Sequence, residues 1–347
     1  MLSSKDLKCI SLFAINFIVV AVTCRQTPSV QRNGQNNLNN RPLIGVVSQK
    51  LDDTSSYIAA SYVKFVEMAG ARAVPFTHDM TPAEVRERFG KVNGVLLPGG
   101  AACLEPGCGY YDVSAQLLQL TMEANDRGEF FPLLGTCLGF EAMVVAVSRN
   151  SSILGSFDAE NMAARLRFTE DAPGSRFFQT FPPALMEAMA HAELTMENHN
   201  FGIDPATFAG DWRLNDTFKV LTVSYDRRAR EYVSTVEARR YPILATQWHA
   251  EKNAFEWASF LNIPHSAEAV AVTQALANNL VGMARHSSHS PNGIDEELDL
   301  LIYNHPVTFT GKTKPAASGR EGEEGAFLQI YKFLDRAIRS DAVAYSR

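Results

Sequence analysis

A cysteine between two glycines is the first feature of this sequence that could carry chemistry. Cys137 stands in the heptad Gly135-Thr136-Cys137-Leu138-Gly139-Phe140-Glu141, after the apolar run 130–134 and before the apolar run 142–147. This pattern predicts a buried strand, a sharp turn and a helix, which is the arrangement of a nucleophile elbow with sulfur in place of a hydroxyl. The start of the helix would favour the thiolate form of the cysteine. The alternative is a buried cysteine in a helix-capping turn, and the heptad alone does not separate the two.

His249 is the histidine best placed to activate this cysteine. It follows the end of the strand-like run 243–248, and Glu251 stands two residues further on. Because residues i and i+2 of an extended segment project to the same side, this carboxylate can accept the second imidazole N–H and support the imidazolium. The alternative is a histidine that caps a strand at the surface. His199 lies in the polar segment 197–201, which is predicted to be a loop, and is a candidate to line the same cleft.

A second glycine-bearing turn, Pro98-Gly99-Gly100, follows another strand-like run. The backbone N–H groups of Gly100 and Leu138 are predicted to converge over Cys137 as an oxyanion hole. The alternative is a simple flexible turn, since such dipeptides occur in many loops.

The sequence indicates neither a metal site nor a nucleotide cofactor. His286 and His289 have helical spacing but lie in a Ser-rich stretch without a cysteine pair. No Gly-x-Gly-x-x-Gly or Walker-type loop appears in the chain. The formal net charge of −6 and the lack of a basic stripe argue against nucleic acid as the main partner.

Short apolar runs alternate with helical patterns through the first half of the chain. The predicted strands are 42–48, 72–76, 92–97 and 130–134, and the predicted helices are 55–68 (with Ser55 or Ser56 as N-cap), a segment starting at Thr81, and 111–127. This alternation is typical of a doubly wound parallel sheet, in which active sites lie outside the carboxyl ends of the strands. Further strands are predicted at 218–225, 232–238 and 243–248, before a helix over 266–285.

The N-terminal segment has the pattern of a secretory signal. A positively charged start precedes a short apolar stretch, 10–22, with small residues near its end. We therefore predict a signal peptide over 1–24, an Asn/Gln-rich linker over 25–40, and no membrane association after signal removal. The alternative is an uncleaved N-terminal anchor. Two sequons, at Asn150 and Asn215, agree with the secretory route and with a glycoprotein.

The cysteine count supports a reactive thiol at position 137. Cys103 and Cys108 lie in one Gly/Pro-containing loop and can pair in an oxidising compartment. After removal of the signal peptide, this pairing leaves Cys137 as the free cysteine. A single free cysteine in a secreted or lysosomal enzyme is a candidate nucleophile.

The catalytic domain is predicted over 41–285, followed by a variable C-terminal tail over 286–347. In this tail, 310–325 is Gly/Lys/Glu-rich and is predicted to be mobile, and 327–338 is predicted to form a short amphipathic helix.

Together, these motifs resemble the class I glutamine amidotransferase-like superfamily and, within it, the gamma-glutamyl hydrolase family of C26 peptidases. The resemblance rests on the heptad around Cys137 and on Gln247-Trp248-His249-Ala250-Glu251-Lys252. Further stretches that are similar to this family are 56–64, 97–100, 178–182 and 252–257. The resemblance covers about residues 41–285.

This resemblance implies a three-layer α/β/α sandwich with a mostly parallel central sheet. It also implies a homodimeric cysteine hydrolase that cleaves γ-linked glutamate from folate poly-γ-glutamates through a thioester, outside the cell or in a lysosome or vacuole. By position, Cys137 matches the family's nucleophile and His249 its general base and acid, with Glu251 as the orienting carboxylate. The resemblance implies no cofactor.

Three further residues are candidates for substrate binding. Glu141 and His199 match positions of the family's motifs, and Lys252 is a candidate for binding the free α-carboxylates of the substrate. One departure from the family is that its usual His-Pro-Glu appears here as His249-Ala250-Glu251, which leaves the role of Glu251 open. Two other functions also stay open: a glutaminase-type amidotransferase, and a non-catalytic binding protein of the same fold.

Overall fold

The computed structural model describes residues 38–312, 327–336 and 338. The predicted signal peptide, 1–24, lies outside the described residues, as does the predicted linker up to residue 37. Within these described ranges, no helix is both long and apolar enough to cross a membrane.

An eight-stranded sheet forms the centre of the fold, with the strand order β4-β1-β5-β6-β12-β11-β10-β8. Strands β4, β1, β5, β6 and β12 are parallel to one another, and β11, β10 and β8 extend the sheet from β12 in antiparallel fashion. In this order the strands span Arg72–Phe76, Leu43–Val47, Gly94–Leu97, Leu133–Thr136, Ile243–Thr246, Glu231–Ala238, Phe218–Tyr225 and Arg167–Phe168.

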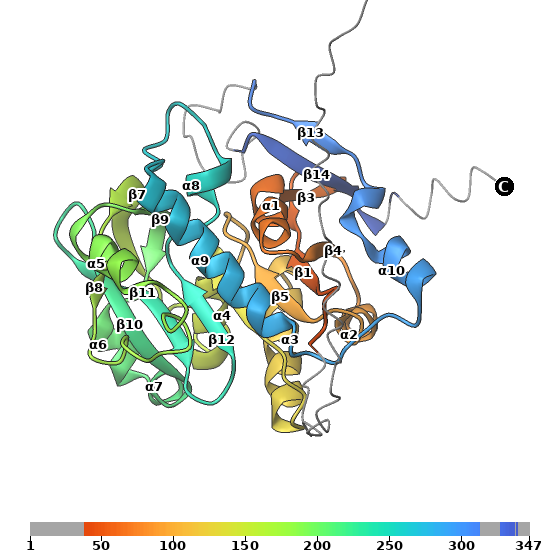
Figure 1. Ribbon diagram of the computed structural model, residues 1–347, viewed down its shortest axis with the longest axis horizontal. Helices are drawn as coiled ribbons and strands as arrows, with labels where there is room; N and C mark the ends of the chain where they lie inside the picture. Colours follow the sequence, from red (N-terminus) through yellow and green to blue (C-terminus); the bar gives the residue numbers. More distant parts are fainter. Residues whose placement is uncertain (1–37, 313–326, 337, 339–347) are drawn as a thin grey trace, which may run out of the picture. The chain divides into compact units, whose positions relative to one another are not determined.

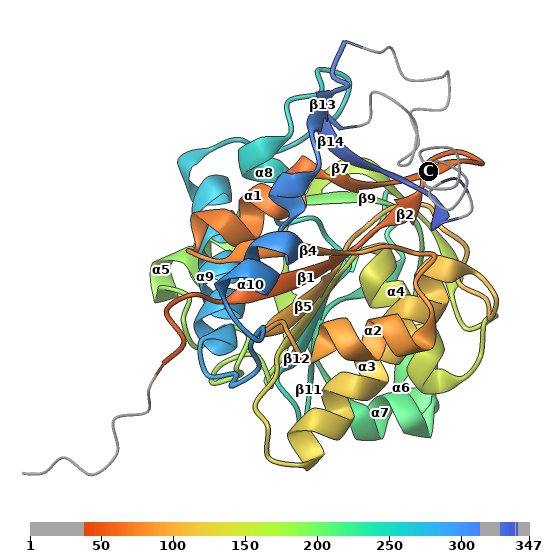
Figure 2. The same cartoon turned by 90° about the vertical axis from the view of Figure 1, so that its right-hand side faces the viewer.

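Helices cover both faces of this sheet (Figures 1 and 2). One face carries α1 (Ala60–Met68), α5 (Pro183–His191) and α9 (Ala267–Ala284). The other carries α2 (Pro82–Phe89), α3 (Gly109–Asp126), α4 (Leu138–Ser148), α6 (Pro205–Gly210) and α7 (Trp212–Thr217). The predicted three-layer α/β/α sandwich with a mostly parallel sheet is therefore confirmed.

The central strands are apolar throughout because both of their faces are buried. In β1, Ile44 and Val46 belong to the core beneath α1 and α9, whereas Leu43 and Val47 belong to the core beneath α2, α3 and α4. This alternation with a period of two explains why the strand appears in the sequence as a continuous apolar run.

Local signals also begin two helices where the sequence predicts them. Thr81 and Glu84 form a capping box at the start of α2, in which each side chain accepts a hydrogen bond from the other's backbone N–H. The hydroxyl of Ser266 caps α9 by accepting from the N–H of Ala269. Each cap satisfies backbone donors that the first helical turn leaves without partners.

The first helix begins later than predicted. Ser55 and Ser56 do not cap a helix, because Ser55–Ala59 forms the strand β3 and α1 begins only at Ala60. β3 pairs with β2 (Gln49–Lys50) on one side and with β14 (Gln329–Leu334) on the other. These pairings, one of them to the far end of the chain, outweigh the local helix signal.

The prediction of an amphipathic helix over 327–338 is wrong, since half of this segment is the strand β14. It belongs to a four-stranded sheet with the order β13-β14-β3-β2, in which β13 is Val307–Phe309. Ile330 and Phe333 are buried in the same core as α1. Most of the predicted mobile stretch, from 313 onward, lies outside the described residues.

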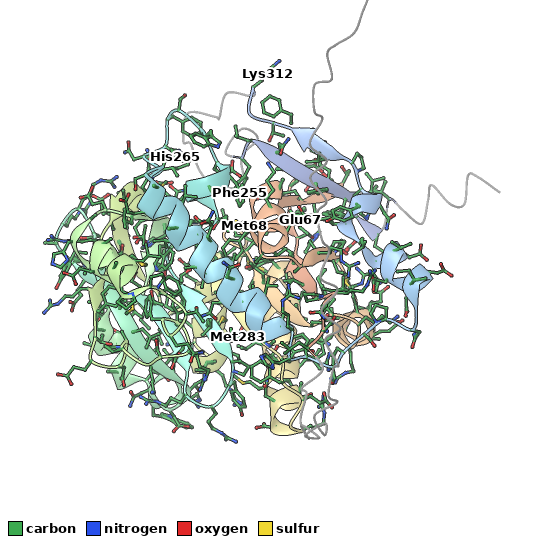
Figure 3. All side chains as sticks on the ribbon, in the orientation of Figure 1. Glu67, Met68, Phe255, His265, Met283 and Lys312 are labelled. Carbon is green, nitrogen blue, oxygen red and sulfur yellow. A yellow bond between two sulfur atoms is a disulfide. The ribbon has the colours of Figure 1, made fainter. Side chains whose placement is uncertain are left out.

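The remaining elements lie outside the eight-stranded sheet. β7 (Gly155–Ala164) and β9 (Thr195–Gly202) form a two-stranded sheet, and α8 (Lys252–Phe255) is a short helix before α9. α10 (Ile294–Leu300) and the 3₁₀ helix η1 (Ile302–Asn304) lead to β13. Tyr303 of η1 donates a hydrogen bond to Glu67, near the end of α1. Glu67 and its neighbour Met68 are labelled in Figure 3.

We predict that Phe333→Ala destabilises the protein far more than Leu334→Ala. Phe333 is 3% exposed and Leu334 is 53% exposed, so only the first substitution leaves a cavity. We expect a loss in the free energy of unfolding of about 3 kcal/mol for Phe333→Ala and within about 0.5 kcal/mol for Leu334→Ala, measured by urea denaturation. Equal losses would contradict the strand, in which neighbouring side chains point to opposite faces.

Candidate active site

Cys137 occupies the sharp turn between β6 and α4. It is the N-cap residue of α4 and has a φ of 50°, a left-handed conformation that is strained for a residue with a side chain. Its N–H donates to the carbonyl of Thr246, at the end of the neighbouring strand β12, with an N···O distance of 2.7 Å. A Cβ atom added at Gly139 would lie 2.1 Å from the carbonyl oxygen of Leu97, so only glycine lets the turn approach β5. The predicted strand–turn–helix is therefore present.

Cys137 takes part in no disulfide within the described residues, and it is buried. Cys103 and Cys108 form a disulfide, a pairing that the sequence allows but does not decide. Nε2 of Gln247 lies 3.9 Å from Sγ of Cys137 and donates to Glu141 at 2.9 Å. Glu141 is therefore buried beside the thiol, one turn along α4.

His249 and Glu251 form a buried pair directly after β12. Nδ1 of His249 lies 2.7 Å from a carboxylate oxygen of Glu251, as expected from their spacing, and the intervening Ala250 does not prevent this contact. The N–H of His249 donates to the carbonyl of Met196 at 2.8 Å, which anchors the histidine backbone to β9. The phenol oxygen of Tyr62, on α1, lies 3.3 Å from the same imidazole nitrogen.

Cys137 and His249 both lie next to Gly99. A Cβ atom added there would lie 2.5 Å from Cε1 of His249 and 3.1 Å from Cβ of Cys137. Both side chains therefore border this glycine, at the carboxyl ends of β5, β6 and β12.

Hydrogen bonds from several elements hold the Pro98-Gly99 backbone in place. Tyr110 donates to the carbonyl of Pro98 at 2.5 Å, and Gln49 donates to the carbonyl of Gly99 at 2.5 Å. The N–H of Gly99 in turn donates to the phenol oxygen of Tyr62 at 2.8 Å. Burial raises the pKa of Tyr110 well above its usual value, so its phenol remains a proton donor.

The two predicted oxyanion donors are the backbone N–H groups of Leu138 and Gly100. Leu138 is the first residue of α4, where a helical N–H has no partner within the helix. Gly100 follows the held backbone, and a Cβ atom there would lie 1.9 Å from the side-chain oxygen of Gln49. Only glycine therefore fits at position 100 with Gln49 in its present place.

His199 lies in β9 and not in a loop as predicted, because 195–202 pairs with β7. Its Nδ1 lies 2.6 Å from the carbonyl oxygen of Phe201, and its Nε2 lies 3.2 Å from a carboxylate oxygen of Glu197. Burial by itself would lower the pKa of His199, but the hydrogen bond and charge of Glu197, with smaller effects of Glu141 and Phe201, together raise it.

Lys252 is buried beneath the C-terminal segment. Its ammonium nitrogen lies 4.6 Å from the ring centre of Phe327, in a cation–π contact. Burial raises the pKa of Glu256, while the positive charge of Lys252 acts in the opposite direction. Lys252 therefore directs its charge into this buried cluster.

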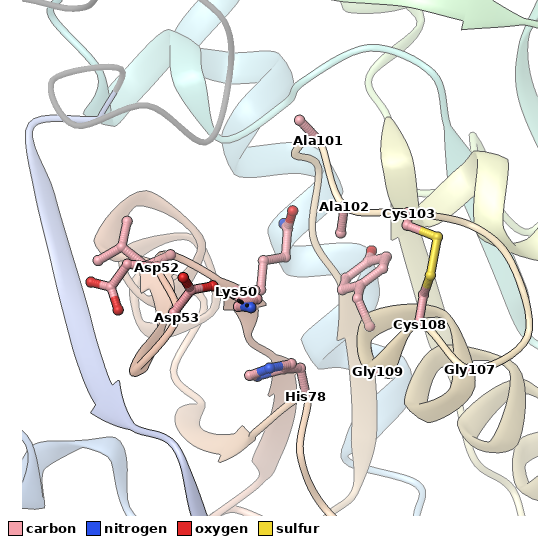
Figure 4. A pocket seen from close by; sticks show the side chains of 13 residues that line it. Lys50, Asp52, Asp53, His78, Ala101, Ala102, Cys103, Gly107, Cys108 and Gly109 are labelled. Atoms are coloured by element: carbon pink, nitrogen blue, oxygen red, sulfur yellow. Dashed lines mark hydrogen bonds and ion pairs between the residues drawn. A yellow bond between two sulfur atoms is a disulfide. The ribbon is translucent and has the colours of Figure 1, made fainter. Parts of the chain in front are cut away.

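A cavity of about 740 Å³ opens next to the loop that follows Pro98 and Gly99 (Figure 4). It is lined by residues of three segments: Gln49, Lys50, Leu51, Asp52 and Asp53 after β1; His78 after β4; and Ala101–Cys103 and Gly107–Tyr110 around the disulfide. Gln49 both lines this cavity and donates to Gly99, so the cavity adjoins the backbone that borders Cys137.

Sequence reasoning did not find Tyr62, Gln49, Tyr110 or Gln247. Tyr62 and Gln247 fall in stretches that resemble the family, but no sequence pattern indicates a role in the site for Gln49 or Tyr110. Their contacts depend on which strand ends lie side by side, which the sequence does not state. Among the residues that the structure describes, no group of three His, Cys, Asp or Glu side chains could hold a metal ion.

Comparison with known proteins adds family information to this geometry. Residues 42–251 match the family Peptidase C26. Gamma-glutamyl hydrolase 1 of Arabidopsis thaliana is 43% identical over 285 residues, which cover 79% of this chain and 80% of that protein. Gamma-glutamyl hydrolase 2 of the same plant is 41% identical, with 79% and 81% covered. Gamma-glutamyl hydrolase of Mus musculus is 40% identical over 281 residues, with 80% and 88% covered.

We predict that Tyr62→Phe destabilises the protein by about 1–3 kcal/mol, because the buried N–H of Gly99 loses its acceptor. Urea denaturation measures this loss. Tyr111→Phe is the matched control, because Tyr111 is a half-buried tyrosine on α3 outside the site. If the two variants were equally stable, the phenol of Tyr62 would not hold the loop.

Proposed function

The chain belongs to the peptidase C26 family, and on this premise we propose that it is a cysteine-type gamma-glutamyl hydrolase. The observation that carries the proposal is the hydrogen-bonded pair of His249 and Glu251, at 2.7 Å, which borders the same glycine as Cys137. An acid–base histidine oriented by a carboxylate beside a nucleophile is the arrangement that acyl transfer requires.

In the proposed reaction, Cys137 loses its proton to His249 and Sγ attacks the γ-carbonyl carbon of the substrate. A C–S bond forms, the C–N bond breaks, and the imidazolium of His249 protonates the departing glutamate amine. A water molecule, deprotonated by His249, then hydrolyses the thioester. Glu251 supports the imidazolium through Nδ1.

The oxyanion of each tetrahedral intermediate would be held by the N–H groups of Gly100 and Leu138. The first is supported by the hydrogen bonds that fix Pro98 and Gly99, and the second by its position at the start of α4. Donors that are fixed before the reaction stabilise the developing charge without a reorganisation cost.

We propose folate poly-γ-glutamates as the substrate, with Glu141 and His199 shaping the cleft beside the thiol. The cavity of about 740 Å³ beside Gly99 offers room next to the reacting bond. Lys252 is a weaker candidate, since its ammonium lies against Phe327. A glutaminase and a non-catalytic protein are the rival functions, and the names of the relatives favour a hydrolase.

The proposal includes the secretory route and a homodimer. The disulfide between Cys103 and Cys108 fits an oxidising compartment, and Asn150 and Asn215, the sequon residues, are both exposed. Light scattering of the purified protein would measure the oligomeric state directly.

Cys137→Ala and His249→Asn should abolish hydrolysis of a pteroyl-poly-γ-glutamate and leave the fold intact. Loss of the nucleophile or its base costs about 10⁶-fold in kcat in a well-studied serine hydrolase. Single-turnover kinetics with matched circular dichroism spectra would measure both effects. His191→Asn is the control, because the side chain of His191 is 71% exposed at the end of α5. Hydrolysis by Cys137→Ala at the unmodified rate would refute the mechanism.

The choice of bond is a separate prediction. Pteroyl-tri-γ-glutamate should be hydrolysed, whereas its α-linked isomer and free glutamine should react at least about 100-fold more slowly, since a site built for one polar arrangement strongly rejects another. Chromatography of the products by chain length measures the rates and identifies the cleaved bond. Preferred turnover of glutamine would favour the glutaminase instead.

A further inference from the structure

Glu197 and His199 form a second buried acid–histidine pair, on the strand that passes behind the thiol. Both stand on the same face of β9, and their side chains are 0% and 1% exposed. The strand reaches Cys137 through the intervening residue, since the carbonyl oxygen of Asn198 lies 4.0 Å from Sγ. The proposed mechanism assigns no step to Glu197.

The hydrogen bonds of the His199 ring indicate its protonation state. Nδ1 faces the backbone carbonyl of Phe201 at 2.6 Å, and a carbonyl oxygen can only accept. Nε2 faces the carboxylate of Glu197 at 3.2 Å, and an ionised carboxylate can only accept as well. With acceptors at both nitrogens, the ring satisfies both contacts as an imidazolium.

The groups around this ring are consistent with a positive charge. Glu197 faces it from its own strand, and the charge of Glu141, on α4, acts on it as well. From β11, the ring of Tyr232 packs edge-on at 4.8 Å, and burial keeps the pKa of that phenol well above its usual value, so it stays neutral. The residue opposite His199 on β7 is Ala159, which carries no charge.

We propose that Glu197 is a positioning residue that holds His199 as an imidazolium, which places a fixed positive charge next in sequence to Asn198, whose backbone carbonyl faces the thiol of Cys137. This inference rests on the proposed function, and it adds a residue that acts through His199. The negative charge of Glu141, which is buried beside the thiol, acts on this ring, so an imidazolium there offsets the charge of Glu141. The orientation of the ring is fixed at the same time by Phe201 and Glu197.

The sign of the pH dependence follows from this charge. The pKa of His199 is raised, so the imidazolium persists above the usual histidine range and is lost as the pH rises through that raised value. Without the carboxylate of Glu197, burial lowers the pKa of His199 against only the smaller raising effects of Glu141 and Phe201, because burial disfavours the charged form. The falling, alkaline side of the activity profile should therefore move to lower pH when Glu197 is neutralised.

Nuclear magnetic resonance of the ¹⁵N-histidine-labelled protein tests the charge directly and needs no substrate. At pH 7, both ring nitrogens of His199 should carry protons in the wild-type protein, and one of them should lose its proton in Glu197→Gln. The His199 signals are assigned by their absence from His199→Asn. A singly protonated ring in the wild-type protein would overturn the inference, whether or not the chain hydrolyses γ-glutamyl bonds.

The pH profile of kcat/KM provides the second test. In Glu197→Gln, the alkaline midpoint should move down by about one pH unit or more, the size of shift that one close opposite charge produces. Glu237→Gln is the matched control, because Glu237 is an equally buried carboxylate on β11 that accepts from the N–H of Phe177, outside the site. It should leave the midpoint in place. An unchanged midpoint in Glu197→Gln, or the same shift in Glu237→Gln, would overturn the role of Glu197.

Absence of all activity in the wild-type protein would refute the proposed function instead. The charge of His199 would then be tested by the resonance experiment, which needs no substrate.

Discussion

The candidate site depends on the parallel pairing of β6 with β12. These strands run side by side to their carboxyl ends, where Thr136 lies opposite Thr246 and the N–H of Cys137 bonds to the carbonyl of Thr246. Cys137, with a φ of 50°, lies in the turn after β6. His249 lies three residues after Thr246, the last residue of β12 that pairs with β6. Without this pairing, two segments that are far apart in the chain would not meet.

Every other contact in the site fixes groups that this pairing has already brought together. β9 holds the backbone of His249 through Met196, and Glu251 holds its ring. Tyr62 links α1 to the loop after β5 and to the imidazole. Such second contacts matter because a catalytic group contributes only when it is held close to its reactive geometry.

The parts of this site that were predictable are those with a local cause. The elbow follows from an apolar run, two glycines and a helical pattern, and the contact of His249 with Glu251 follows from a spacing of two residues. The strand β14 could not be predicted in this way, since its partner is β3, near the other end of the described chain. The same pairing explains why Ser55 and Ser56 belong to a strand and not to a helix cap. Likewise, the strand conformation of His199 depends on β7, which the polar segment around it does not indicate.

The central claim is that Cys137 carries the acyl group. Mass spectrometry of the acid-quenched enzyme, taken during a single turnover of a pteroyl-poly-γ-glutamate and digested with protease, tests it directly. We expect a transient mass increase equal to the pteroyl-glutamyl acyl group on the peptide that contains Cys137, and we expect it to decay as free product accumulates. An acyl group on a different residue would contradict it.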